Sequence, residues 1–334
     1  MASQAPTLRA LRQLLVRRVS LAGASFRVDA NYDFTRSTRD NYQAGPSDAG
    51  ASDASSYAAI RAQLDAAYHG TYARARRQFQ DRLVDAVVDL PAAEPRTAPW
   101  IVFTAGAMGA GKTHVMDWLC ERGVLPLMVP IDADLFKAAL PEWAGYVSRD
   151  PLTAGFHTRR ESGYLVELAQ EASLRARQHV WVDGSLRDGE WYQQVFARIR
   201  ARHPAYRIAI LYVAADRDTV YRRIAARAEE TGRHVPRAEV DDSLARVPKS
   251  VERLAAQVEF LAGIDNSTDA PQLRSYFCEA DDLSRDVDLR AADDDADEWA
   301  PLRDHFSDGG TPPPPVAPTL PPPGPRREPL TSKL

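Results

Sequence analysis

The sequence predicts an α/β fold in which a mostly parallel β-sheet lies between two layers of helices. From Trp100 to about Asn266, short apolar runs alternate with stretches of helical periodicity. Four runs have the composition of buried parallel strands: WIVFTA, PLMVPID, HVWVDGS and YRIAILYVAA. Because a helical stretch follows each run, the order of elements favours a sheet with helices on both faces.

The composition is that of a globular protein, with 334 residues, 44% apolar and 26% charged. With 42 basic and 46 acidic residues the net charge is −4, so the overall charge does not favour nucleic acid or a membrane surface as partner. No apolar run approaches the roughly 20 residues that span a bilayer. Two cysteines, Cys120 and Cys278, are too few for a disulfide framework or a zinc site, which indicates a reducing compartment.

Residues 1–95 predict a helical N-terminal extension. The first 27 residues contain arginine but no acid, which is typical of a surface helix or, alternatively, of a mitochondrial transit peptide. Residues 29–56 are rich in Asn, Asp, Ser and Gly and predict a loop. Between residues 57 and 90, apolar side chains recur at helical spacing and predict one or two long helices, which the following prolines end.

Residues 279–334 predict a disordered tail. Residues 279–308 are acidic and are expected to be solvated, and the chain beyond Gly310 is dominated by proline, which favours an extended segment. The last residues, Ser332, Lys333 and Leu334, match the address read by the peroxisomal import receptor. In a eukaryote they would direct the protein to the peroxisome or glycosome; without import it would be cytoplasmic, and the arginine-rich start leaves the mitochondrion as an alternative.

The strongest motif is a phosphate-binding loop of the pattern G-x-x-x-x-G-K-S/T. Its residues are Gly106, Ala107, Met108, Gly109, Ala110, Gly111, Lys112 and Thr113. Glycines let backbone N–H groups turn toward phosphate oxygens, and the helix that follows presents its positive dipole end to them. Lys112 supplies a positive charge to the phosphates, and the Thr113 hydroxyl is a ligand for Mg²⁺. The sequence therefore predicts a P-loop NTPase domain over residues 96–278 that binds ATP or GTP with Mg²⁺.

Three carboxylates follow the second and third predicted strands. Parallel strands end at one edge of the sheet, so Asp132, Asp134 and Asp183 are expected beside the phosphate loop. Asp183 ends an apolar strand, as a Walker B residue that holds Mg²⁺ through water does. For Asp132 and Asp134 the interpretations that remain are a helix N-cap, a general base and a contact to the water shell of Mg²⁺, and one residue can cap while the other serves the reaction.

Further charged residues are candidates for contacts with phosphate or substrate. Arg187 follows Asp183 by four residues and is placed to meet either. A basic helix that contains Arg227 leads to a Thr-Gly-Arg turn at Arg233, which predicts a mobile lid; a solvated basic helix is the alternative. Glu161 lies in a helical stretch, and its position alone predicts a surface charge.

In their order and spacing these motifs resemble those of the zeta-toxin family of P-loop kinases over about residues 98–266. The runs FTAGAMGAGK, VDGSLRD and TGR-x-VP are similar to those of longer, eukaryotic-type zeta-toxin-domain proteins. The resemblance implies ATP- or GTP-dependent phosphorylation of a hydroxyl group of a small molecule, with a nucleotide sugar as one candidate.

The resemblance also implies roles for single residues. Asp134 matches the catalytic base, Glu161 a substrate-contacting acid, and Arg227 and Arg233 the lid arginines that stabilise the transferring phosphoryl group. Asp183 stands where the bacterial toxins carry glutamate, and the segment from 137 to 157 does not resemble theirs. The resemblance therefore implies neither their acceptor nor an antitoxin partner.

Other functions remain open. The chain could belong to another class of P-loop kinase, acting on a nucleoside, a gluconate-like molecule or a polynucleotide 5′-hydroxyl, or it could be an ATP-binding switch without turnover. The predicted base and lid favour a kinase, because a switch does not require a substrate base. Residues 57–90 also allow two interpretations, structural packing on the sheet and inhibition of the nucleotide site in cis.

Overall fold

The computed structural model describes residues 8–45, 48, 55–90, 95–231, 235–278, 283–286 and 297–307. Three features of the sequence lie outside the described residues: the predicted lid arginine Arg233, the proline-rich segment and the final Ser332, Lys333 and Leu334.

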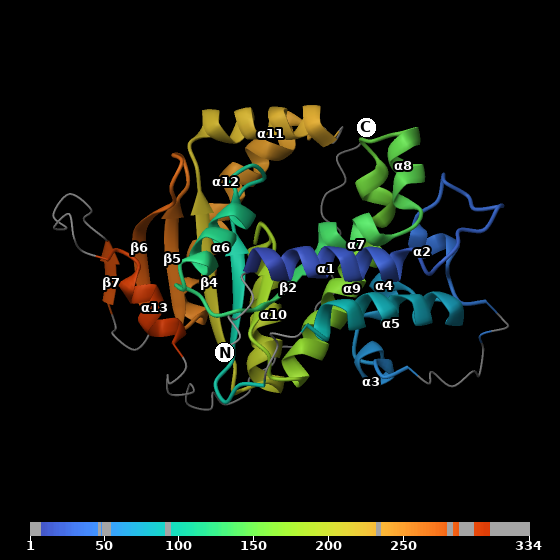
Figure 1. Ribbon diagram of the computed structural model, residues 1–334, viewed down its shortest axis with the longest axis horizontal. Helices are drawn as coiled ribbons and strands as arrows, with labels where there is room; N and C mark the ends of the chain where they lie inside the picture. The colour runs from blue at the N-terminus through green and yellow to red at the C-terminus, as the bar shows by residue number, and fades with distance from the viewer. Residues whose placement is uncertain are drawn as a thin grey trace, which may run out of the picture.

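The centre of the molecule is a seven-stranded sheet with the order β2-β3-β1-β4-β5-β6-β7 (Figure 1). Its strands are β1 (Trp100–Ala105), β2 (Val129–Asp132), β3 (Val180–Asp183), β4 (Arg207–Ala214), β5 (Phe260–Asp265), β6 (Gln272–Cys278) and β7 (Leu283–Asp286). Strands β1 to β5 are parallel, and β6 and β7 add an antiparallel edge. The four predicted strands are confirmed as β1 to β4, as is the mostly parallel α/β class.

Helices cover both faces of the sheet. The described helices are α1 (Leu8–Gly23), α2 (Thr38–Asn41), α3 (Ala58–Arg61), α4 (Ala66–His69), α5 (Arg74–Val88), α6 (Lys112–Glu121), α7 (Ala133–Ala139), α8 (Trp143–Arg149), α9 (Ala154–Arg175), α10 (Gly189–Arg202), α11 (Arg217–Thr231), α12 (Arg237–Leu254), η2 (Ala255–Gln257) and α13 (Ala300–Phe306). In β1, Ile101 and Phe103 belong to one apolar core, and Trp100 and Val102 to the core on the opposite face. This alternation follows from the pleat, which points successive side chains to opposite faces. None of the described helices is long and apolar enough to cross a membrane.

The described residues between 8 and 90, here called the N-terminal layer, contribute to the main core. Figure 1 shows α1 and α5, in blue and teal, beside the green helices α7 and α9. Phe79, Leu83 and Val87 of α5 are each 0% exposed. Burying a side chain of this kind stabilises a fold by about 1.5–3 kcal/mol, so α5 is an integral element and not a peripheral addition.

The prediction of long helices over residues 57–90 is correct only for α5. Residues 57–72 instead contain α3 and α4, each of one turn. The Asp65 side chain caps the start of α4 by accepting a hydrogen bond from Tyr68 N, and Gly70 ends the helix at φ 79°. An N-cap and a glycine in the left-handed region limit the helix to one turn, although the apolar spacing continues.

The prediction of a solvated segment over residues 279–308 is wrong for α13. Trp299, Leu302 and Phe306 are buried at the second core. The ring of Trp299 lies 5.0 Å from that of Trp118 in α6, and Phe306 packs 4.8 Å from Trp100. Apolar residues with the i, i+3, i+7 spacing of a helix face therefore outweigh the acidic composition around them.

Candidate active site

The phosphate loop joins β1 to α6. Gly106 opens it with φ 151°, and its N–H donates a hydrogen bond to the carbonyl of Ser185, 3.2 Å away, in the loop after β3. A Cβ atom on Gly106 would lie 2.4 Å from the carbonyl oxygen of Val213, so no other residue fits at this position. The loop is held between the ends of its two neighbouring strands, β3 and β4.

Lys112 lies across this loop. Its Nζ donates hydrogen bonds to the carbonyls of Gly106 and Ala107, at 3.1 and 3.2 Å. Burial lowers the pKa of Lys112, while the carboxylates of Asp183 and Asp134 act in the opposite direction. The ammonium group is thus desolvated and surrounded by carboxylates, where it acts more strongly on a phosphate than a solvated lysine does.

Thr113, the next residue, faces the end of β3. Its hydroxyl donates a hydrogen bond to Oδ2 of Asp183 at 3.3 Å, and Thr104 of β1 donates to Oδ1 at 3.0 Å. In the described part of the chain, no group of three His, Cys, Asp or Glu residues could enclose a metal ion. Magnesium in a phosphate site needs only one or two protein oxygens besides phosphate and water, so a hydroxyl beside one carboxylate fits this ion.

The structure shows which of Asp132 and Asp134 caps the helix. Asp132 is the N-cap of α7, because its Oδ1 accepts a hydrogen bond from Asp134 N at 2.7 Å. Burial, together with the charges of Asp183 and Asp134, raises the pKa of Asp132 to about 6. Asp134 is partly exposed, and its Oδ1 accepts a hydrogen bond from Lys137 at 2.9 Å. Asp134 is therefore the more accessible carboxylate at this edge.

Two of the predicted arginines lie on elements that flank the phosphate loop. Arg227 is an exposed residue of α11, which Figure 1 shows in gold above the sheet, and its charge acts on Lys112. Arg187, in the loop after β3, forms an ion pair with Asp242 of α12 at 3.4 Å. Its neighbour Leu186 has φ 53°, an uncommon conformation for leucine that gives this loop a fixed shape.

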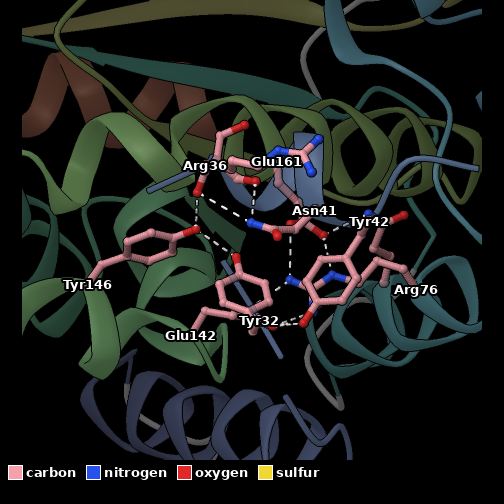
Figure 2. Close-up of polar contacts among 10 residues, drawn as sticks. Tyr32, Arg36, Asn41, Tyr42, Arg76, Glu142, Tyr146 and Glu161 are labelled. Atoms are coloured by element: carbon pink, nitrogen blue, oxygen red, sulfur yellow. Dashed lines mark hydrogen bonds and ion pairs between the residues drawn. The ribbon is translucent and has the colours of Figure 1, made fainter. Parts of the chain in front are cut away.

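Glu161 is not the surface charge that its helical position predicts. It is 0% exposed, and Arg76 of α5 donates hydrogen bonds to both of its oxygens at 2.7 and 3.0 Å (Figure 2). The same guanidinium binds both oxygens of Glu142, at 2.9 and 3.1 Å. Although burial acts to lower it, the pKa of Arg76 is raised, because Glu161 and Glu142 favour the charged form.

Tyrosines complete this buried cluster. The hydroxyl of Tyr42 donates a hydrogen bond to Glu142 at 2.5 Å, and the Tyr32 and Tyr146 hydroxyls lie 2.6 Å apart (Figure 2). The ring of Tyr42 also lies 4.1 Å from the Arg76 guanidinium. The cluster thus joins the N-terminal layer to α8 and α9, next to α7, the helix that carries Asp134.

Sequence reasoning missed Arg76, although a signal was present. Arg76 precedes Phe79 and Leu83 by three and seven residues, so it lies on the apolar face of α5. An arginine on a buried helix face requires an acidic partner. Glu161 has the same property, because it precedes Leu165 and Leu168 by four and seven residues on α9.

Comparison with known proteins gives one family. The model of the family described as Zeta toxin matches residues 84–269, which is more than half of the chain. No curated protein matches the sequence. Among solved structures, AvrRxo1-ORF1:AvrRxo1-ORF2 with sulphate ions has a TM-score of 0.50 at 14% identity, covering 76% of this chain and 80% of that one. The PezAT toxin–antitoxin system of Streptococcus pneumoniae has a TM-score of 0.49 at 16% identity, covering 57% and 76%.

Proposed function

The chain belongs to the zeta toxin family, and on this basis we propose that it is an ATP- or GTP-dependent kinase that phosphorylates a hydroxyl group of a small molecule. The observation that carries the proposal is the contact of Thr113 with Asp183, beside Lys112 and at the sheet edge where Asp134 lies. This arrangement combines a phosphate loop, two side chains that can hold a metal ion and an accessible carboxylate. Phosphoryl transfer requires these three parts.

In the proposed mechanism Asp134 accepts the proton of the acceptor hydroxyl. Its carboxylate is partly exposed, and Lys137 donates a hydrogen bond to one of its oxygens. Arg227 lies on α11, and the proposal gives the same role to Arg233, six positions further along the sequence. Positive charge beside the transferring group favours a transition state whose charge spreads over the phosphoryl oxygens.

Thr113 and Asp183 would hold Mg²⁺, the first directly and the second through water. The ion supplies positive charge to the phosphate oxygens when it is bound. Thr104 contributes by fixing the second oxygen of Asp183. Such partners orient a ligand and tune its basicity.

Arg187 is the proposed contact to the acceptor. Its ion pair with Asp242 is partly exposed, so an anionic group of the substrate can replace that carboxylate at small cost. A substrate contact by Glu161 stays a prediction from the resemblance. It would require one oxygen of Glu161 to leave Arg76, since both are bound.

The experiment is a transfer assay with the full-length protein, Mg²⁺, ATP labelled at the γ-phosphate and a small-molecule cell extract. We expect label in a new small molecule, and loss of this product in Asp134→Asn with retained binding of MgATP. Asp304→Asn, at an exposed position of α13, is the control and should behave as wild type. Label in inorganic phosphate alone would support the ATP-binding switch, and transfer to nucleosides or 5′-hydroxyl oligonucleotides would support the other kinase classes.

A further inference from the structure

Asn266 is buried beneath the phosphate loop. It follows β5 directly, is 1% exposed, and its Nδ2 donates a hydrogen bond to the carbonyl of Ala110 at 2.8 Å. Its own backbone N–H donates to the carbonyl of Ala214 at 2.8 Å, so the residue is anchored to the end of β4. A carbonyl can only accept, which fixes the side-chain amide with nitrogen toward the loop.

This contact sets the direction of one peptide plane. In a trans peptide the C=O and the following N–H point in opposite directions. Because Asn266 holds the Ala110 carbonyl on its own side, the N–H of Gly111 must point away from Asn266. Backbone N–H groups of this loop are the donors that bind phosphate oxygens, so the contact aims one of them.

The third glycine of the motif permits this approach. Gly111 has φ 85°, and a Cβ there would lie 2.3 Å from Nδ2 of Asn266. Any side chain at position 111 would therefore displace Asn266, in addition to the strain at this φ. The motif glycine and Asn266, far apart in the sequence, are a matched pair.

A second contact connects the same peptide to the predicted lid. Nη1 of Arg223, a residue of α11, lies 2.8 Å from the carbonyl oxygen of Asn266 and 3.4 Å from that of Ala110. Since α11 also carries Arg227, the position of the helix and the direction of the Gly111 N–H depend on one another.

We propose that Asn266 is a positioning residue for the triphosphate, which it serves by orienting the Ala110–Gly111 peptide, with Arg223 as the link to α11. This inference rests on the proposed function, because it assumes that the loop binds a nucleotide. The buried Oδ1 of Asn266 has no hydrogen-bond partner among the described residues. An unpartnered buried oxygen lowers stability, and its presence indicates that the residue is kept for the loop and not for the stability of the fold.

The test compares Asn266→Leu, which has a similar volume and no donor, with wild type. Binding of MgATP and of magnesium tripolyphosphate, which contains no nucleoside, is measured by calorimetry on the full-length protein. Loss of an oriented donor to a charged phosphate should lower both affinities about tenfold or more. Thr268→Val, exposed and two residues further on, is the control and should leave both unchanged.

Four outcomes separate the possibilities. Unchanged affinities in Asn266→Leu would overturn the inference alone, whereas absence of nucleotide binding by wild type would overturn the proposed function with it. A loss for MgATP but not for tripolyphosphate would mean that Asn266 contacts the nucleoside, which also contradicts the inference.

If Asn266→Leu does not fold, Asn266→Ser and Asn266→Ala take its place, because they differ only by a donor hydroxyl. Equal tripolyphosphate affinities in that pair would overturn the inference.

Discussion

The hydroxyl of Thr113 lies 3.3 Å from Oδ2 of Asp183, although the two residues are 70 positions apart. Parallel pairing of β1 with β3, in which Phe103 is opposite Val182, brings the end of β3 to the start of α6. The second carboxylate oxygen accepts a hydrogen bond from Thr104. Two hydroxyl groups from one strand–loop–helix unit therefore set the orientation of Asp183.

Asp183→Asn should weaken the response to magnesium more than the binding of nucleotide alone. The amide keeps the size of the side chain but removes the charge that attracts the ion. We expect the Mg²⁺ concentration for half-maximal phosphotransfer to rise about 10- to 100-fold, the range found when partners of metal ligands are changed. A magnesium titration at saturating nucleotide measures this. An unchanged midpoint would remove Asp183 from the proposed metal site.

Lys112→Ala should abolish phosphotransfer and leave the fold intact. Among the described residues, the hydrogen bonds of Lys112 Nζ go to two loop carbonyls, so the core loses no hydrogen bond, whereas the phosphates lose a desolvated positive charge. The expected loss of rate is about 100-fold or more, as for other oriented electrostatic groups. Lys249→Ala, at an exposed site on α12, is the control for the loss of a lysine. Retained turnover in Lys112→Ala with normal thermal unfolding would contradict the proposed mechanism.

Arg76→Ala should destabilise the protein strongly. It leaves the carboxylates of Glu142 and Glu161 buried without a cation, for which a loss of about 3–5 kcal/mol is typical. Urea unfolding measures the effect. Arg74→Ala, exposed on the same helix, should change the free energy of unfolding by less than about 0.5 kcal/mol. Equal stabilities of the two variants would show that the buried cluster does not hold the N-terminal layer in place.

Asp132→Asn should stabilise the protein in a manner that depends on pH. The folded pKa of Asp132 is about 6, above the ordinary value of 3.8, so its ionised form lowers stability. This penalty is absent below the unfolded pKa, grows between about pH 4 and 6, and is complete above the folded pKa. Asparagine keeps the cap of α7 and cannot ionise.

The increase in the free energy of unfolding caused by Asp132→Asn should therefore be larger at pH 8 than at pH 5, by about 1.5 kcal/mol. Urea unfolding at both pH values, without nucleotide or magnesium, measures it. The control is Asp304→Asn on the surface of α13, for which the difference between the two pH values should be close to zero. A gain that is equal at pH 5 and pH 8 would contradict a raised pKa at Asp132.

Local sequence signals were enough for the centre of the fold. Strands β1 to β4 are continuous apolar runs, and the loop from Gly106 to Thr113 has a motif whose residue types follow from phosphate binding. The carboxylates at the strand ends followed from the shared edge of a parallel sheet. These inferences needed only neighbouring residues and the geometry of one layer.

The remaining features depend on contacts between distant segments. Glu161 is buried because α5 brings Arg76 against it from 85 positions away, and no local pattern gives that pairing. The short helix α4 depends on the N-cap Asp65 and on Gly70, which interrupt a continuing apolar spacing. Helix α13 packs on the second apolar core, whose side chains come from strands and helices that are close together only in the assembled sheet.

The three buried charges also restrict how this sequence can diverge. Replacing Arg76 alone leaves two unpaired acids, and replacing either acid alone takes away half of the guanidinium's partners. Related chains should therefore carry either all three residues or an uncharged set in their place, with mixed sets rare. Relatives that carry Arg76, Glu142 and Glu161 together are expected to share the N-terminal layer.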